Sequence, residues 1–177
     1  MKIKIPLLKL NENAVLPKFK HDTDAGADLI AVSCLYNEKY DRFEYGLGFA
    51  TEIPEGYYIK IAPRSSNTKT EAYLPNGEGT IDSDYRGEWK VFYKLRTRFD
   101  ELFPTGDRNL NLIEMENELA PYEVGDKIAQ CFLCKKPDWE FVETDKLSET
   151  ERGTDGGINR IDKDCKKWLL KKNLLNL

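Results

Sequence analysis

The sequence lacks the features that mark membrane, secreted or disulfide-built proteins. None of its apolar runs approaches the roughly 18 residues that a membrane-spanning helix needs. Met1 is followed by charged residues rather than by the apolar segment of a signal or transit peptide, so we expect a cytoplasmic protein. The 177 residues include four cysteines and one histidine. Four cysteines are too few to build a disulfide framework in a chain of this length, and free thiols are expected.

An excess of positive charge is also missing. Lysine and arginine number 27 against 31 aspartates and glutamates, which gives a net charge of -4. This balance argues against a large surface for nonspecific nucleic-acid binding. A small phosphate-bearing ligand needs only a few well-placed cations and stays compatible with the composition. The length and the 40% of hydrophobic residues are typical of one globular domain.

Short runs of β-type residues dominate what is present. They are separated by turn signals such as PEG at residues 54–56 and PNG at residues 75–77. Closely spaced strands without helical stretches between them predict an all-β sandwich, jelly roll or barrel. The expected strands cover residues 2–10, 26–33, 45–53, 57–62, 88–95, 110–115, 127–134 and 140–143.

Two segments do not follow the strand pattern. Residues 96–118 have mixed charge and a PTG turn signal, which predicts a long surface insertion between two core strands. After Gly157, apolar residues recur at helical spacing among lysines, which predicts a short amphipathic C-terminal helix. We therefore expect one β domain over residues 1–150, followed by an arm and a helix over residues 151–177.

Five polar clusters stand out against the strand background, and none has the GxxxxGK pattern of a phosphate-binding loop. Their order and spacing closely resemble the five motifs of the trimeric deoxyuridine triphosphatase (dUTPase) family. The resemblance covers roughly residues 14–157, and its third motif is the longest and most specific. The clusters are residues 24–29 (DAGADL), 63–66 (PRSS), 79–88 (GTIDSDYRGE), 122–130 (YEVGDKIAQ) and 152–157 (RGTDGG).

The resemblance implies a fold, an assembly and a reaction. The fold is a distorted β-jelly roll, and the assembly is a homotrimer with active sites shared between subunits. The reaction is that of a dUTP diphosphatase: water attacks the α-phosphorus of dUTP, with Mg²⁺ on the triphosphate, and yields dUMP and pyrophosphate. Such an enzyme limits uracil incorporation into DNA and supplies dUMP for thymidylate synthesis. No direct nucleic-acid or membrane partner is expected.

Two aspartates receive catalytic roles from this resemblance. Asp82 matches the carboxylate that orients and deprotonates the attacking water and lies near the deoxyribose 3′-OH. Asp28 matches the acid of the first motif, which supports the water and metal network and reaches Mg²⁺ through water. No residue is expected to ligate the metal directly. For Asp28, a turn aspartate that bonds its own backbone is the structural alternative.

The substrate-binding residues come from the same match. Tyr85 would lie under the sugar, where a 2′-OH collides with its ring. Asn76 corresponds to an asparagine that faces uracil beside a base-reading hairpin, although PNG is also a turn signal. The second and fourth motifs supply guanidinium, hydroxyl and amide groups suited to phosphate oxygens. The expected set is Arg64, Ser65, Ser66, Asn76, Gly79, Ile81, Tyr85, Gln130, Arg152 and Gly153.

The fifth motif departs from the family pattern. Arg152 and Gly153 fit, but the residues that follow include no aromatic to stack on uracil and no Ser-Thr pair for phosphate. Asp155 would also repel phosphate. In one interpretation Ile158 covers the base and Arg160 replaces the phosphate contacts. In the other, this segment is a plain linker into the terminal helix.

Two other functions compete with dUTP hydrolysis. A dCTP deaminase resembles the same fold but needs a glutamate on the strand after the third motif, where residues 91–93 read VFY. A dUTP-sensing or protein-binding descendant of a dUTPase would use the altered arm. Its protein partner would dock on the C-terminal helix or on the 96–118 insertion. For the helix, packing on its own trimer is the simpler expectation.

Some remaining residues have structural interpretations. Cys131 and Cys134 are three apart in an expected strand and so face opposite sides, which argues against a metal or redox pair. His21 is expected in a turn or at the surface. Trp89 and Trp139 are expected in the core or at the trimer interface.

Overall fold

The computed structural model describes residues 2–96, 119–151 and 153 of the chain. The chain divides into two units, Met1–Asp138 and Trp139–Leu177. All the strands that the structure describes belong to the first unit. The strand expected over residues 110–115 and the C-terminal helix lie outside the described residues, as does the insertion after Arg96.

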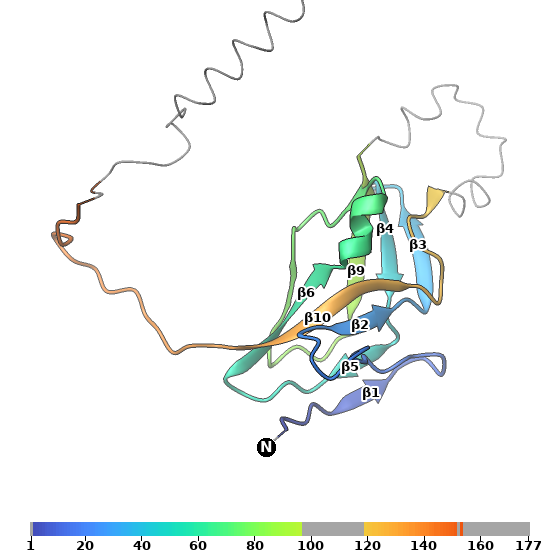
Figure 1. Cartoon of the computed structure of the whole chain (residues 1–177), viewed down its shortest axis with the longest axis horizontal. Helices are drawn as coiled ribbons and strands as arrows, with labels where there is room; N and C mark the ends of the chain where they lie inside the picture. The colour runs from blue at the N-terminus through green and yellow to red at the C-terminus, as the bar shows by residue number, and fades with distance from the viewer. Residues whose placement is uncertain (1, 97–118, 152, 154–177) are drawn as a thin grey trace, which may run out of the picture. The chain divides into compact units, whose positions relative to one another are not determined.

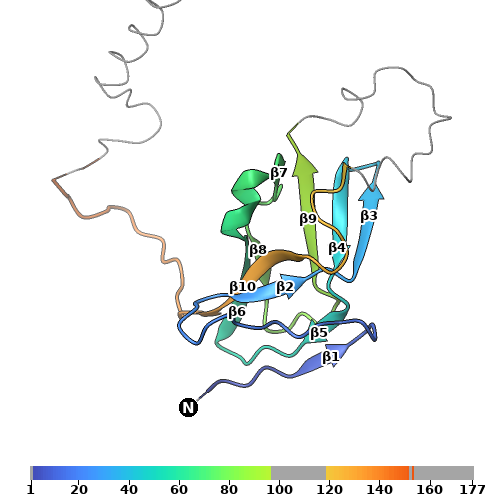
Figure 2. The same cartoon turned by 45° about the vertical axis from the view of Figure 1, so that its right-hand side comes forward.

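Within the part of the chain that the structure describes, ten strands form three antiparallel sheets, so the all-β expectation is confirmed. One sheet pairs β1 with β5, the second has the order β2-β10-β6-β8, and the third has the order β3-β4-β9-β7 (Figures 1 and 2). A short 3-10 helix, η1 (Ser65–Lys69), follows β6. The strands are β1 (Leu7–Lys9), β2 (Ala27–Ile30), β3 (Ser33–Asn37), β4 (Arg42–Gly46), β5 (Phe49–Thr51), β6 (Tyr57–Pro63), β7 (Ala72–Tyr73), β8 (Gly79–Ile81), β9 (Lys90–Leu95) and β10 (Lys127–Lys135).

Two of the expected strands are wrong. Residues 45–53 are not one strand, because the chain turns at Gly48, whose φ of 68° separates β4 from β5. Residues 140–143 are exposed and pair with no strand among the described residues, so their alternation alone does not make a sheet. The sequence interpretation also missed the β3–β4 hairpin, η1, β7 and β8.

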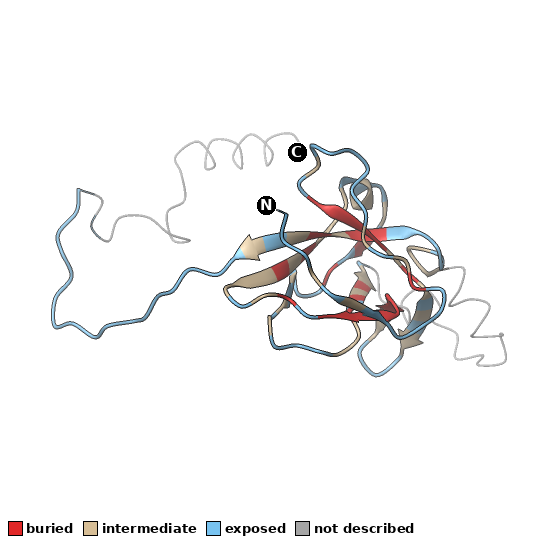
Figure 3. Cartoon of the chain, turned by 90° about the horizontal axis from the view of Figure 1, so that it is seen from below, coloured by how far each residue is buried: buried red, intermediate tan, exposed pale blue. Residues whose placement is uncertain are grey.

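The core is a single cluster of buried residues contributed by all three sheets. Figure 3 marks the buried segments of the chain in red. Its largest fully buried members include Tyr45, Tyr93, Phe43 and Phe49. Aromatic side chains of this size bury much apolar area, which is the main stabilising contribution to such a small β domain.

The two tryptophans that the structure describes, of three in the sequence, have different environments. Trp89 is buried in the core against Phe49, as expected. Trp139 is 64% exposed and packs its ring edge against Phe141, so the core interpretation is wrong for it.

His21 lies exposed in a turn. Among the described residues, no helix is long and apolar enough to cross a membrane.

Candidate active site

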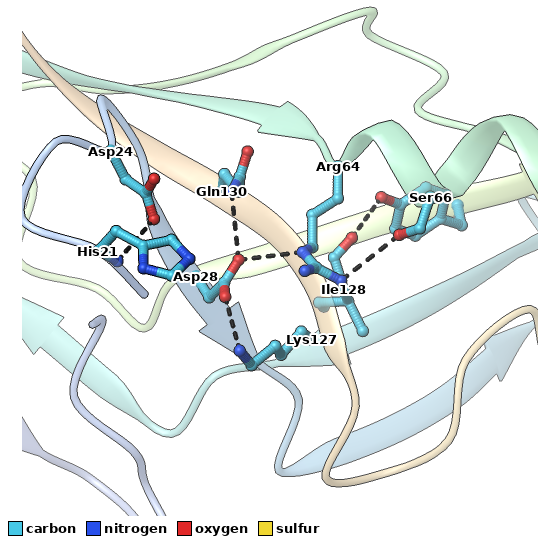
Figure 4. A network of polar contacts seen from close by, with 9 residues as sticks. His21, Asp24, Asp28, Arg64, Ser66, Lys127, Ile128 and Gln130 are labelled. Atoms are coloured by element: carbon cyan, nitrogen blue, oxygen red, sulfur yellow. Dashed lines mark hydrogen bonds and ion pairs between the residues drawn. The ribbon is translucent and has the colours of Figure 1, made fainter. Parts of the chain in front are cut away.

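One candidate site is a group of polar side chains around a buried carboxylate. The Asp28 cluster consists of Asp28, Arg64, Ser66, Lys127 and Gln130 (Figure 4). Asp28 Oδ1 accepts hydrogen bonds from Arg64 Nε at 3.0 Å and from Gln130 Nε2 at 3.2 Å. Lys127 Nζ lies 2.8 Å from Asp28 Oδ2. The cluster therefore joins the first, second and fourth polar motifs.

The strand order explains why these motifs meet. β10 lies between β2 and β6, and its register places Gln130 opposite both Asp28 and Ala62. Arg64 directly follows the end of β6 and forms the N-terminal boundary of η1. Its guanidinium also lies 3.4 Å from Ser66 Oγ, while Ser65 is exposed on the same helix.

The electrostatics of the cluster favour an ionised carboxylate. Burial alone raises the pKa of Asp28. Hydrogen bonds from Lys127 and Gln130, with the charges of Arg64 and Lys127, outweigh burial and hold the pKa below its ordinary value of 3.8. Two cations face one anion, so the cluster has one net positive charge and suits an anionic ligand.

A second candidate site is a pocket of about 610 Å³ beside β8. The β8 pocket collects five of the residues expected to bind or act on substrate: Asn76, Gly79, Ile81, Asp82 and Tyr85. Its remaining lining residues are Ile61, Leu74, Thr80, Glu88, Lys90, Val91 and Phe92. A pocket that combines apolar walls with a few convergent polar groups is typical of a small-molecule site.

Asn76 lies in the expected turn and also at the β8 pocket. The Gly77 N–H donates to the carbonyl oxygen of Leu74 at 3.0 Å, which closes the expected turn. Gly77 has a φ of 71°, a conformation that glycine adopts without strain. Asn76 also lines the pocket, so the turn is what delivers its side chain to the site.

Tyr85 is held at the pocket by its own motif. Its hydroxyl donates to the carbonyl oxygen of Glu88 at 3.1 Å. A β-carbon at Gly87 would lie only 2.6 Å from Tyr85 Cζ, so the glycine leaves the room that the ring occupies. Glu88 Oε1 in turn accepts the Gly48 N–H at 2.9 Å.

Comparison with known proteins identifies the family. The family model described as dUTPase matches residues 12–159. A deoxyuridine 5′-triphosphate nucleotidohydrolase of Wolinella succinogenes is 36% identical over 156 residues, covering 88% of this chain and 92% of the relative. A protein of the same name from Nautilia profundicola is 35% identical, covering 87% of this chain and 96% of its own. The chain belongs to the dUTPase family.

Solved dUTPase structures have a similar fold. A mutant dUTPase of Staphylococcus bacteriophage 80alpha with dUpNHpp superposes with a TM-score of 0.67 at 21% identity, covering 88% of this chain and 97% of the other. A mutant dUTPase of phage phi11 of S. aureus, described with a structural Mg(II) ion, gives a TM-score of 0.59 at 21% identity and covers 82% and 99%.

Within the described part of the chain, the residues of the dUTPase motifs form two separate groups, the Asp28 cluster and the β8 pocket. No lining residue of the β8 pocket belongs to the Asp28 cluster, although β6 supplies Ile61 to the pocket and leads directly into Arg64. Arg152 lies outside the described residues. Gly153 belongs to the second unit, where its N–H bonds Thr150, and it is not placed relative to the two groups.

Sequence reasoning overlooked two residues that the structure brings into these groups. Lys127 bonds Asp28, and Glu88 lines the β8 pocket. Both lie inside the polar motifs of the sequence, so their place in a motif could have marked them as site residues. The partner of Lys127 is far away in sequence, and only the pairing of β10 with β2 brings the two close. Glu88 lies three positions from Tyr85 in the same motif.

Proposed function

We propose that this chain hydrolyses dUTP to dUMP and pyrophosphate. The observation that carries the proposal is the β8 pocket, which gathers Asn76, Asp82 and Tyr85. A base-facing amide, a carboxylate and an aromatic ring are the groups that a deoxyuridine and an attacking water require. The names of the two similar bacterial relatives support the same substrate.

In the proposed mechanism each group has a separate task. Asp82 accepts a proton from the water that attacks the α-phosphorus, and pyrophosphate leaves. Tyr85 excludes a 2′-OH by contact with the sugar, while Asn76 and the backbone of β8 read the base. Arg64, Ser65, Ser66 and Gln130 hold the phosphate oxygens, because phosphoryl transfer depends on positioning and charge neutralisation. Arg152 and Gly153 are proposed to add contacts from the arm.

The contacts of the Asp28 carboxylate suggest a specific role for it. Its two oxygens accept bonds from Arg64, Gln130 and Lys127, so the carboxylate fixes the direction of two cations and an amide. We expect it to orient the phosphate-binding side chains as well as to support the water and metal network. Orientation of charged donors before substrate arrives is what makes them effective in the transition state.

Magnesium is proposed to arrive with the triphosphate. Mg²⁺ usually binds one or two carboxylates together with substrate phosphates and keeps several waters. Among the residues that the structure describes, no three His, Cys, Asp or Glu side chains form a group that could hold a metal. Asp28 and Asp82 fit a cation that is held mainly by phosphate oxygens. When bound, the ion would neutralise charge on the triphosphate.

The proposed assembly is a homotrimer of jelly-roll protomers. The β8 pocket and the Asp28 cluster share no lining residue, which supports a complete site built from the pocket of one subunit and the cluster of another. The proposed setting is the cytoplasm, where removal of dUTP limits uracil in DNA and dUMP feeds thymidylate synthesis.

The decisive experiment measures pyrophosphate release from dUTP, dCTP, dTTP and UTP, with Mg²⁺ and with a chelator. We expect Mg²⁺-dependent turnover of dUTP, with the other three nucleotides at least about a hundredfold slower, because a site whose polar groups match one ligand rejects an analogue that leaves them unpaired. Turnover of all four nucleotides at similar rates would contradict the assignment of Asn76 and Tyr85.

Each of the two rival functions has a readout of its own, measured beside pyrophosphate release. Glu88 brings a carboxylate to the pocket, but its Oε1 already accepts the Gly48 N–H. Ammonia release from dCTP would nevertheless identify a deaminase. Tight dUTP binding without pyrophosphate release would instead favour a sensing or protein-binding descendant.

A further inference from the structure

A hydrogen bond between two side chains joins η1, which continues the second motif, to the fourth motif, and it lies outside the Asp28 cluster. The Tyr122 hydroxyl donates to Asn67 Oδ1 at 2.8 Å. The two residues are 55 positions apart, so only the fold brings them together. Neither belongs to the set of residues proposed to contact substrate or to hold Asp28.

Asn67 lies inside the turn that presents the phosphate-binding side chains. Its backbone N–H donates to the carbonyl oxygen of Arg64 at 2.9 Å, and its own carbonyl oxygen accepts the Thr70 N–H at 3.0 Å. Its side-chain Nδ2 donates to the carbonyl oxygen of Ala72 at 3.0 Å, where β7 begins. Both ends of the Asn67 amide are therefore used, and this side chain ties η1 to the start of β7.

Tyr122 is anchored on the opposite side by the core. The Tyr45 hydroxyl donates to the Tyr122 carbonyl oxygen at 2.9 Å and accepts the Tyr122 N–H at 3.2 Å. The Tyr122 ring packs against Tyr93 at 5.1 Å and Tyr45 at 6.2 Å between centroids. Because the ring and the backbone are both fixed, the direction of the hydroxyl is set before substrate binds.

The hydroxyl remains a donor at neutral pH. Burial raises the pKa of Tyr122 and outweighs the opposing effects of the Tyr93 hydroxyl and of the nearby charge of Arg64. A neutral phenol bonded to a neutral amide also adds no charge to the phosphate site. The pair can therefore hold η1 in place without competing with the triphosphate for Arg64.

We propose that Tyr122 is a positioning residue, which through Asn67 keeps η1 aligned with β10 so that the second and fourth motifs meet the triphosphate together. The inference rests on the proposed dUTPase function and deepens it. η1 is a short 3-10 helix with no buried residue, so it has little packing of its own to keep it aligned. Loss of the bond should therefore weaken recognition of the phosphate chain more than recognition of the nucleoside.

The test compares a triphosphate ligand with a monophosphate ligand by calorimetry on the full chain. Tyr122→Phe removes one oxygen and keeps the ring. It should weaken binding of the dUTP analogue dUpNHpp by about tenfold, the size expected for the loss of one part-buried hydrogen bond, and change binding of dUMP by less than about twofold. The KM for dUTP should rise with the analogue's dissociation constant. As a control, Tyr36→Phe removes another tyrosine hydrogen bond, the 2.7 Å bond to Asp41, and should leave both affinities unchanged.

A second variant tests whether the two side chains act as one unit. Asn67→Ala should weaken dUpNHpp binding at least as much as Tyr122→Phe, and adding Tyr122→Phe to it should cost little more. Additive effects, or equal weakening of dUMP and dUpNHpp, would overturn the positioning role. If the unmodified chain neither bound dUpNHpp nor hydrolysed dUTP, the proposed function would fail with it. Normal dUTP turnover with an unaffected Tyr122→Phe variant would overturn the positioning role alone.

Discussion

Among the residues that the structure describes, Asp28 is the one buried charged residue, with 6% of its surface exposed. Such a carboxylate needs partners, because an isolated buried charge is strongly destabilising. Arg64, Lys127 and Gln130 supply them, and they also make the residue hard to replace. The same contacts that are proposed to orient the phosphate-binding groups thus contribute to folding.

The lowered pKa of Asp28 predicts how stability depends on pH. The unfolded chain binds the Asp28 proton more tightly than the folded chain does, so this contribution is complete above about pH 4 and is lost as the pH falls through the folded-state pKa. Asp28→Asn should therefore lower the free energy of unfolding by about 1–3 kcal/mol at pH 7. In thermal melts, the difference in melting temperature between Asp28→Asn and the unmodified chain should be smaller at pH 3 than at pH 7.

The exposed Asp22, in the turn beside His21, is the matched control. Asp22→Asn should change the melting temperature little at either pH, since surface substitutions are usually worth less than about 0.5 kcal/mol. A gap for Asp28→Asn that stayed constant from pH 7 to pH 3 would show that its effect is steric rather than electrostatic.

Asp82 allows a direct test of the catalytic assignment. Asp82→Asn keeps the shape of the side chain but removes the proton acceptor, so kcat for dUTP should fall by about 10²–10⁴-fold while the affinity for dUpNHpp changes little. Stopped-flow measurement of pyrophosphate release provides the rate. Asp84 is exposed in the same motif and does not line the pocket, so Asp84→Asn should retain turnover. Near-normal turnover in Asp82→Asn would exclude it as the base.

At the scale of single residues, the sequence predicted more about the pocket than about the Asp28 cluster. Asn76, Asp82 and Tyr85 lie within ten positions of one another, so a local motif is enough to group them. Lys127 was overlooked because a lysine after a Gly-Asp turn is usually solvated. Only the antiparallel pairing of β2 with β10 places it against Asp28.

Among the elements, the junction between β4 and β5 explains the largest error in the strand assignment. The apolar run across residues 45–53 looks continuous, yet Gly48 divides it. A β-carbon there would lie 2.8 Å from Val32 Cγ2 and 2.9 Å from Asn11 Cβ. The Gly48 carbonyl oxygen also accepts two N–H groups that follow β1, from Leu10 and Asn11. Such tertiary contacts override strand propensity and are invisible to periodicity.

This junction predicts unequal costs for two glycine substitutions. Gly48 and Gly56 both have positive φ, 68° and 79°, but nothing lies within 4 Å of a β-carbon placed at Gly56. Gly56→Ala should cost about 1 kcal/mol, from backbone strain alone. Gly48→Ala adds two close contacts and should cost roughly 2–4 kcal/mol. Urea unfolding of both variants measures the difference, and equal midpoints would contradict a steric role for the crowded site.

For the molecule as a whole, strands interrupted by Gly and Pro turns were enough to predict an all-β domain, but not how its sheets are ordered. The order β2-β10-β6-β8 brings together strands from both ends of the domain, and this sets which motifs meet. It leaves the Asp28 cluster and the β8 pocket as two groups that share no lining residue. A second copy of the chain is the proposed source of the missing half of each site.

Mixing two inactive variants tests this arrangement. Asp82→Asn damages the β8 pocket, and Arg64→Ala damages the Asp28 cluster. If each site joins the pocket of one subunit to the cluster of the next, mixed trimers contain sites in which both halves are intact. Random assortment at equal amounts makes about one site in four complete, so co-expressed variants should recover roughly a quarter of normal dUTP turnover.

Light scattering on the same samples should give three times the 20.5 kDa protomer mass. The two variants purified separately and assayed together without subunit exchange serve as the control and should stay inactive. A site contained in one chain gives no recovery in either preparation, because every subunit then has one damaged half. Recovery of activity in the mixed trimers alone would therefore locate the two halves of the site on different subunits.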